Sequence, residues 1–263
     1  SLALTDDGLY AWGGNGGGQL GDGTTTDSSV PVKVIFPAGV TVRAIAAGAY
    51  HSMAITDNGL YTWGDNGGAQ LGDGTRIVRT TPVRVVFPAA VTTLVAISGG
   101  GYHSLAITAD GVYAWGNNTF GQLGDGSTIV RLTPTKVKFP SSAMPTTVTA
   151  IAGGFWHSLA IGDGSVFGWG YNGNGELGDG TVTARSVPVR TVFPKKTTVI
   201  ATAIAAGSMH SLAATDKGLF AWGNNSSGQL GMTGTTRYTA TQVKGESNAI
   251  AVGAGYYHSL ALH

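Results

Sequence analysis

Short runs of apolar residues alternate along the whole chain with stretches rich in Gly, Asn, Asp and Thr. A run of small apolar residues, such as 97–100, is followed by a second run such as 103–106, and then by a Gly-containing turn and a third run that ends in Trp. Short apolar runs bounded by turn residues are typical of β-strands, and few segments show the period of a helix. The pattern therefore predicts an all-β chain.

This pattern occurs five times along the chain. Each copy carries a Trp-Gly pair, 51 to 54 residues from the next, at Trp12, Trp63, Trp115, Trp169 and Trp222. Each pair is followed by Asn and then by Gln-Leu-Gly, or once by Glu-Leu-Gly. A period of this length indicates a repeat architecture in which every unit buries its apolar faces against its neighbours. Constant positions are then mostly scaffold, and function is sought where the repeats differ.

Each repeat predicts four strands, which we name A to D. In the second repeat, strand A covers 45–48 and strand B covers 51–54, and Asn58-Gly59 is expected at the centre of a B–C hairpin, with positive φ at both residues. Strand D is expected around 82–86, with Pro at its start. Four antiparallel strands per repeat predict a β-propeller that occupies 1–263 as one domain. A closed ring of five blades and a five-blade portion of a longer propeller both remain open.

Composition narrows the classes of function. Only 11% of the residues are charged and the net charge is +1, which argues against nucleic acid as a partner. Cysteine is absent, so disulfides and thiolate metal sites are excluded. No apolar stretch is long enough to span a membrane, and no signal peptide is apparent. Because the chain opens in mid-motif without Met, we expect a mature or excised piece of a protein.

The repeat motif resembles that of a known family. Residues 100–127 contain Gly-x-x-His-Ser-Leu-Ala, then Trp-Gly-x-Asn, and then Gly-Gln-Leu-Gly-Asp-Gly, and the other repeats keep most of it. This motif is similar to the repeat of the regulator of chromosome condensation family, and in texture most similar to its secreted bacterial members. The resemblance implies a β-propeller, usually of seven blades, and favours an extracellular or bacterial cell-surface protein.

Members of that family have two kinds of function. Some are exchange factors for small GTPases, an alternative that the nearly equal repeats without a long acidic insertion make weaker here. Secreted bacterial members inhibit β-lactamases through aromatic side chains at the corner between strands A and B. By resemblance, that binding role falls on Tyr50, Tyr102, Phe155, Trp156, Met209 and Tyr257.

Several motifs that suggest chemistry have simpler structural interpretations. Gly16-x-Gly18-x-x-Gly21 matches a dinucleotide fingerprint, but no helix pattern follows it. Each repeat has a His beside Ser, which we interpret as a backbone hydrogen-bonding group at the A–B corner rather than as a catalytic or metal-binding residue. The Asp residues in Gly-Asp-Gly lack calcium-loop spacing and are interpreted as turn residues. We therefore predict no catalytic residue, no metal and no cofactor.

Large aromatic side chains recur immediately before the repeated His, where the scaffold demands no single residue type. The A–B and C–D loops are expected on one face, which adds aromatic residues of the C–D loops and an Arg that follows each later Trp by 15 or 16 residues. This predicted binding face consists of Tyr50, Tyr102, Phe120, Phe155, Trp156, Tyr171, Met209, Tyr256, Tyr257, Arg79, Arg131, Arg185 and Arg237. The alternative is that the aromatics only cover the blades and the Arg side chains pair with loop Asp.

Tyr, Trp and Arg are the residues that dominate interface hot spots. The sequence therefore predicts a non-enzymatic propeller that presents this face to a macromolecule, with a protein as the expected partner. A carbohydrate is an alternative, because aromatic rings stack on sugars. A structural or self-assembling repeat unit is another, if the ring is open.

Overall fold

The structure, a computed structural model, describes residues 1–88, 93–194 and 198–263. It confirms the all-β prediction, because the described elements are strands apart from one 3₁₀ turn at Ser141–Ala143. No helix among the described residues is long and apolar enough to cross a membrane. The chain divides into two compact units, which are described in turn. That 1–263 form a single domain stays a prediction.

Unit 1 comprises Ser1–Asn118 and Ile129–Lys136 and contains three antiparallel sheets. The first sheet has three strands, β1 (Leu2–Thr5), β2 (Gly8–Gly13) and β3 (Ser28–Lys33). The second has four, β4 (Val42–Ala47), β5 (His51–Thr56), β6 (Gly59–Gly64) and β7 (Arg79–Arg84). The third also has four, β8 (Leu94–Gly99), β9 (His103–Thr108), β10 (Gly111–Gly116) and β11 (Arg131–Lys136).

Unit 2 comprises Thr119–Thr128 and Val137–His263. Its first sheet consists of β12 (Val148–Gly153), β13 (His157–Gly162), β14 (Ser165–Gly170) and β15 (Arg185–Arg190). Its second consists of β16 (Ala201–Ala206), β17 (His210–Thr215), β18 (Gly218–Gly223) and β19 (Arg237–Gln242). A two-stranded sheet of β20 (Ala251–Ala254) and β21 (Ser259–Leu262) follows.

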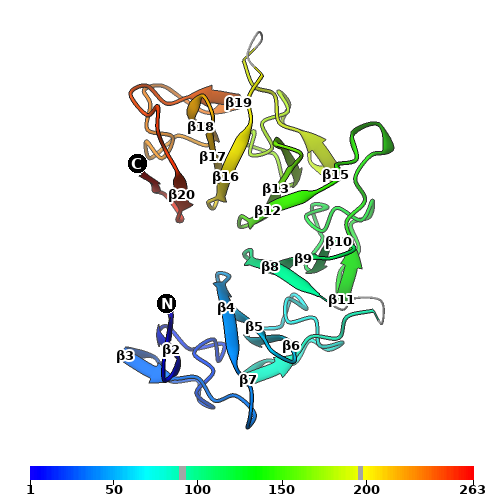
Figure 1. Cartoon of the computed structure of the whole chain (residues 1–263), viewed down its shortest axis with the longest axis vertical. Helices are drawn as coiled ribbons and strands as arrows, with labels where there is room; N and C mark the ends of the chain where they lie inside the picture. The colour runs from blue at the N-terminus through cyan, green and yellow to red at the C-terminus, as the bar shows by residue number, and fades with distance from the viewer. Residues whose placement is uncertain (89–92, 195–197) are drawn as a thin grey trace. The chain divides into compact units, whose positions relative to one another are not determined.

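Each four-stranded sheet is one propeller blade with strands in the order A to D, as predicted (Figure 1). Within unit 1, strand A of one blade, β4, lies beside strand A of the next, β8; within unit 2, β16 lies beside both β12 and β20. The Ala- and Gly-rich sequence of strand A permits this close approach. In the four-stranded sheets, strands B and C are buried along nearly their whole length, in agreement with their continuous apolar sequence.

Tryptophan forms the centre of the packing between neighbouring blades. Trp63 and Trp115 in unit 1, and Trp169 and Trp222 in unit 2, are fully buried. The Phe of a Phe-Pro pair packs edge-on against the Trp of the following repeat, as Phe87 does against Trp115 at 5.7 Å between ring centroids. Burial of large aromatic side chains is the main stabilising contribution to such a core. The repeated Trp is therefore scaffold, as the sequence predicts.

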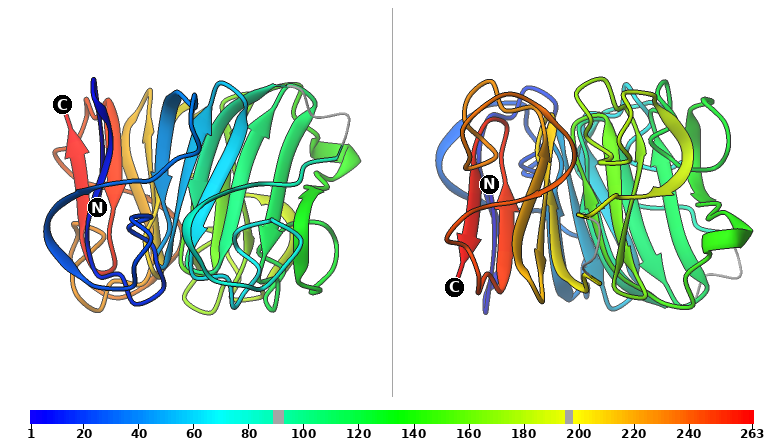
Figure 2. Two further views of the ribbon diagram at one scale, coloured as in Figure 1. Left: turned by 90° about the horizontal axis from the view of Figure 1, so that it is seen from below. Right: turned by 90° about the horizontal axis from the view of Figure 1, so that it is seen from above.

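The strands of each unit run between two ends that carry different loops (Figure 2). We call the end with the A–B and C–D loops the corner end, and the end with the B–C hairpins and D–A linkers the hairpin end. In the register, His51 is opposite Gly64 and Gly64 is opposite Arg79, so strands B, C and D reach the corner end together. The expected placement of A–B and C–D loops at one end is thus observed in each blade.

The predicted centre of the B–C hairpin is wrong in four of the five repeats. Thr56 pairs with Gly59, so Asp57 and Asn58 are the central residues, and only the Gly has positive φ, at 132°. The Thr56 hydroxyl donates a hydrogen bond to the Gly59 carbonyl at 2.8 Å, which favours this shifted turn. Among the described hairpins, both central residues have positive φ, 49° and 73°, in Asp163-Gly164, where the Gly lies at the second central position and Ser165 occupies the place of Gly59.

Strand D also begins earlier than predicted. In the second repeat it starts at Arg79, which places Pro82 at its fourth position instead of at its start. Strand D is the outermost strand of each sheet, so a Pro without an N–H removes no ladder bond on the outer side. The repeated Arg therefore opens strand D rather than lying in the loop before it.

Candidate functional site

A buried chain of hydrogen bonds fixes the corner end and joins neighbouring blades. In unit 1, His51 Nε2 lies 2.8 Å from the hydroxyl of Ser104 in the next blade. That hydroxyl donates to the Gln70 carbonyl at 2.7 Å, and Trp115 Nε1 donates to the same carbonyl at 2.9 Å. Because the hydroxyl proton is committed to Gln70, His51 must donate from Nε2. We call this arrangement the His–Ser–Trp latch.

Unit 2 repeats the latch. His157 and His210 lie 3.0 and 2.9 Å from the hydroxyls of Ser211 and Ser259. The Ser211 hydroxyl donates to the Glu176 carbonyl at 2.8 Å. The predicted structural role of the histidines is therefore observed, but their expected backbone partner is wrong, because Nε2 donates to a Ser of the next blade. A backbone partner within one repeat could not have joined two blades.

Burial sets the protonation of these histidines. It lowers the pKa of His51 to about 4, partly opposed by the charge of Asp65, and it lowers the pKa of His103 to about 3. Burial likewise lowers the pKa of His210 to about 4. These imidazoles are therefore neutral near pH 7. Among the described residues, no cluster of three or more His, Asp or Glu could hold a metal ion.

A second polar network stiffens the C–D loop beside the latch. The buried Asn66 amide donates to the Asp73 carboxylate at 3.2 Å, and its oxygen accepts from the Leu71 amide at 3.0 Å. Asp73 also accepts from the Thr75 amide and hydroxyl at 2.9 and 2.7 Å. Asn172, Leu177, Asp179 and Thr181 repeat these contacts in unit 2. The repeated Asn and Asp are thus loop-forming residues, as the turn interpretation predicts for Asp.

The repeated Arg side chains reach back to their own C–D loops. Arg79 pairs with Asp73, and Arg185 pairs with Asp179, each at 2.7 Å. Arg237 has no Asp in that place and donates to the Thr233 carbonyl at 3.0 Å. These contacts match the alternative in which Arg pairs with loop Asp. The guanidinium groups remain partly exposed at the corner end, two strands from the His, which is roughly 10 Å.

Six of the predicted aromatic side chains form one continuous run within unit 2. Successive rings meet edge-to-face with centroid distances of 4.6 to 5.7 Å. Tyr256 and Tyr257 are 50% and 55% exposed, and the other four are half-buried. We call this surface the aromatic corner, and in order of contact it consists of Tyr171, Phe120, Trp156, Phe155, Tyr256 and Tyr257.

The remaining predicted residues are distributed differently. In unit 1, Tyr50 and Tyr102 stack on each other with centroids 5.1 Å apart and planes at 30°. Met209 occupies the corner between β16 and β17 and is half-buried. Arg131 opens β11 opposite Gly116, in the same position as Arg79 in its own blade. The aromatic positions thus share the corner end of their blades, and Arg79, Arg185 and Arg237 contact loop residues instead of rings.

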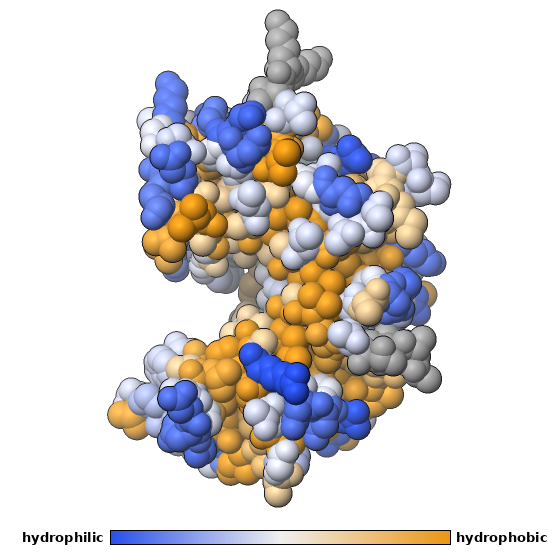
Figure 3. All heavy atoms as spheres, viewed as in Figure 1, coloured by the Kyte–Doolittle hydropathy of each residue, from blue (hydrophilic) through white to orange (hydrophobic). Residues whose placement is uncertain are grey.

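The hairpin end holds a feature that sequence reasoning missed. A cleft of about 720 Å³ opens at this end of unit 1, lined by residues such as Arg43, Leu60, Arg84 and Phe87. On the face shown in Figure 3, hydrophobic surface lies beside hydrophilic groups over β4 to β8. No motif marks the cleft, because its residues come from four separate segments of the chain.

Comparison with known proteins identifies the relatives of this chain. The model of the RCC1-like domain matches residues 1–261. The ultraviolet-B receptor UVR8 of Arabidopsis thaliana is 36% identical over 88% of this chain and 52% of the receptor. The RCC1 domain-containing mitochondrial protein RUG3 of the same plant is 34% identical over 93% of this chain and 56% of its own length. The chain thus spans about half the length of these relatives.

Solved structures support the same assignment. Human WBSCR16 superposes with a TM-score of 0.84 at 27% identity, over 99% of this chain and 69% of that chain. Yeast RCC1 (Prp20), in a structure with Kap60, superposes with a TM-score of 0.83 at 26% identity, over 99% and 65%. All of these relatives are eukaryotic, so they give no support to a secreted bacterial protein, which stays a prediction.

Proposed function

Since the chain belongs to the RCC1-like domain family, we propose that it is a non-enzymatic protein-binding module whose partner docks on the aromatic corner. A precedent is a yeast relative, whose structure has Kap60 bound to RCC1. The main support for this proposal is the run of six aromatic rings in unit 2, of which Tyr256 and Tyr257 are about half exposed. Aromatic residues are enriched in the energetically dominant parts of interfaces.

The surroundings of the aromatic corner support a pre-organised site. Phe120 is held by its own amide, which donates to the Gln122 side chain at 2.9 Å. The Tyr171 amide donates to the Trp156 carbonyl at 2.9 Å, so the C–D and A–B loops of this blade are tied together. A surface whose loops are fixed before binding loses little conformational entropy on docking. Arg185, in the same blade, pairs with Asp179 and remains partly exposed.

Truncation of the rings tests this proposal. We expect Trp156→Ala and Tyr256→Ala each to weaken the complex with a purified protein partner by about 2 kcal/mol or more, because central aromatic anchors dominate binding energy. The affinity is measured by calorimetry with a partner first captured by the native chain. Tyr238→Ala is the matched control, since Tyr238 is 48% exposed in the same unit but lies on β19, outside the aromatic corner.

Two results would remove the proposal. One is an unchanged affinity in both Trp156→Ala and Tyr256→Ala at unchanged thermal stability. The other is an equal loss in Tyr238→Ala. A glycan array assigns the surface to carbohydrate instead, if sugars bind the native chain and the two corner variants abolish that binding.

A second candidate, the self-assembling repeat unit, is favoured by the edge of the last sheet. Among the described residues, β20 and β21 form a two-stranded sheet, and Leu260 and Leu262 on β21 are 66% and 59% exposed. An edge strand with exposed apolar side chains is a template for pairing with another chain. Under this proposal the chain associates in a concentration-dependent way, and Leu260→Lys abolishes the association. A monomeric mass by light scattering over a wide concentration range would exclude it.

A further inference from the structure

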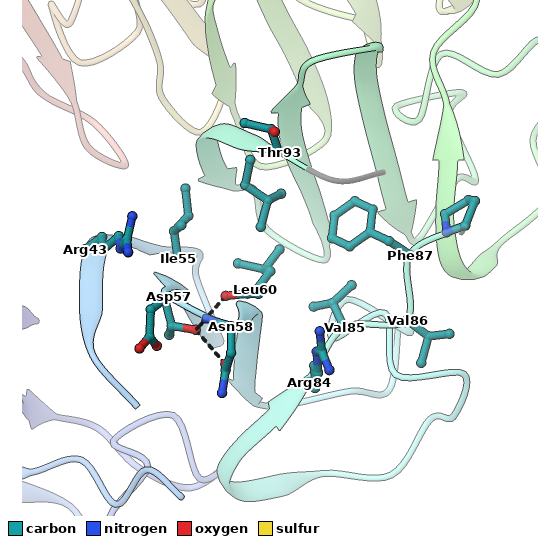
Figure 4. Close-up of a pocket in the computed structure, with 14 residues that line it drawn as sticks. Arg43, Ile55, Asp57, Asn58, Leu60, Arg84, Val85, Val86, Phe87 and Thr93 are labelled. Carbon is teal, nitrogen blue, oxygen red and sulfur yellow. Dashed lines mark hydrogen bonds between the residues drawn. The ribbon is translucent and has the colours of Figure 1, made fainter. Parts of the chain in front are cut away.

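The cleft at the hairpin end of unit 1 combines an apolar floor with a charged rim (Figure 4). The floor is part of the core between two blades, because Ile55, Leu60 and Val85 are buried there and Phe87 and Leu94 pack against them. Figure 4 shows Phe87 pointing toward Ile55 and Leu60 across the opening. The rim contains Arg43 from β4 and Arg84 from β7.

Local hydrogen bonds fix the hairpin beside the cleft. The Gly59 carbonyl accepts from the Thr56 hydroxyl at 2.8 Å. The Asp57 amide donates to the Thr41 carbonyl at 3.1 Å, which ties the hairpin to the linker before β4.

The rim cation Arg84 differs from its counterparts in the other blades of unit 1. Lys33 and Lys136 occupy the position of Arg84, and they bind the hairpin through the Asp7 carbonyl at 2.7 Å and the Asp110 carboxylate at 3.4 Å. The residue equivalent to Asp110 is the neutral Asn58, so Arg84 has no carboxylate at this place. Within the described part of the chain, no hydrogen bond or ion pair engages the guanidinium of Arg43 or Arg84.

Asp57, the acidic residue at the rim, already accepts a hydrogen bond within the chain. Asp57 accepts a hydrogen bond from the Thr41 amide at 3.1 Å, which fixes its carboxylate on the linker before β4. The rim therefore carries two guanidinium groups and one carboxylate that already accepts a hydrogen bond. A guanidinium prefers a carboxylate as a bidentate partner, and the floor offers space for an aliphatic or aromatic side chain.

We propose that this cleft binds an acidic peptide segment in which Asp or Glu flanks a Leu, Ile or Phe. The apolar side chain enters the floor between Leu60 and Phe87, and the flanking carboxylates pair with Arg43 and Arg84. This site lies at the hairpin end and does not depend on the aromatic corner. It is a second docking surface of the chain, for a linear segment instead of a folded face.

A selection from a random octapeptide library tests the cleft. The native chain is compared with Arg43→Glu/Arg84→Glu, and separately with Lys33→Glu/Lys136→Glu, which changes the net charge equally at exposed positions of the same unit. We expect the native chain to enrich peptides with acidic residues beside Leu, Ile or Phe relative to the Arg double variant, but not relative to the Lys double variant. The Kd of an enriched peptide, from fluorescence anisotropy, should rise at least about tenfold in the Arg double variant and change little in the Lys double variant.

Three outcomes overturn the proposal. Peptides enriched equally in both comparisons would show that only bulk charge matters. Enriched peptides without an acidic residue would show that the rim has no role. Displacement of the peptide by inorganic phosphate at the concentration where acetate has no effect would assign the rim to phosphate. Trp156→Ala leaves the Kd unchanged, so failure of the aromatic corner and failure of the cleft are distinguishable.

Discussion

The two ends of the same blades differ in how their polar side chains are paired. At the corner end, the repeated polar side chains are paired and mostly buried: His51 with Ser104, Asn66 with Asp73, and Asp73 with Arg79. At the hairpin end of the same blade, Asn58 stands where the other repeats of unit 1 have Asp, and Arg84 extends without a carboxylate. The corner end is thus defined by what all repeats share, and the hairpin end by one local substitution.

The two proposed binding surfaces differ in origin. The proposed aromatic corner of unit 2 uses positions that vary between repeats. The proposed cleft uses Arg84, whose counterpart Lys136 pairs with an Asp that is replaced by Asn58 in this repeat.

Acidification should have the largest effect on the free energy of unfolding, because it protonates the buried histidines of the corner end. The folded pKa of His51 and His210, about 4, and of His103, about 3, lies below the ordinary value of 6.5. As the pH falls below about 6.5, the unfolded chain binds protons first, so stability present above that pH is lost toward pH 4. Each histidine contributes a loss of about 1.4 kcal/mol per pH unit. Urea midpoints at several pH values measure this.

Removal of one buried histidine tests the source of the acid effect, because His51→Gln should reduce the slope of the pH dependence. A free energy of unfolding that stays flat from pH 6.5 to 4.5 would contradict the assignment of buried neutral histidines.

Removal of a latch tryptophan should have the next largest effect. Trp115→Ala removes a fully buried side chain and its hydrogen bond to Gln70, which should lower the free energy of unfolding by about 3–5 kcal/mol. Trp12, at the same repeat position but only half-buried, provides the comparison, and Trp12→Ala should cost clearly less. Denaturant unfolding measures both, and equal losses would argue against the latch as the source of stability.

A methyl group at the end of strand A should be moderately destabilising. A Cβ on Gly48 would lie 2.5 Å from His51 Nδ1 and 2.6 Å from the Gly100 carbonyl, so one of them must move. We expect Gly48→Ala to cost about 1–3 kcal/mol. In Gly67→Ala the nearest atom, on Asp65, is 3.7 Å away, and the change should stay within about 0.5 kcal/mol. Thermal unfolding of the two variants side by side tests the contrast, which equal midpoints would refute.

The smallest effect concerns Glu176, which replaces the Gln of the other repeats. Burial raises the pKa of Glu176, although Asn174 donates two hydrogen bonds to its carboxylate. The protonated form is favoured in the fold, so its contribution is present below the ordinary value of 4.5 and is lost as the pH rises through the raised pKa. The stability of Glu176→Gln relative to the native chain should therefore increase with pH. Gln229→Glu should show the opposite trend, and pH-independent differences would contradict this prediction.

Part of the site was predictable because repetition exposes it. The aromatic positions precede an invariant His, so Phe155, Trp156 and Tyr256 stand out against a constant background. Their fusion into one run with Phe120 and Tyr171 was not predictable in detail, because it depends on how a C–D loop approaches the neighbouring A–B corner. The role of Arg was left open for the same reason, and the fold shows Arg79 and Arg185 on loop Asp residues.

The sequence by itself determined the strand content, the order of strands in a blade and the scaffold role of Trp, His and Asp, since these follow from local patterns repeated five times. Only the tertiary structure decided which groups meet between blades. It joined His51 to Ser104, residues 53 positions apart, and it left Arg43 and Arg84 beside one apolar cleft. Contacts between blades depend on register and packing across neighbouring repeats, so the repeat period of the sequence does not specify them.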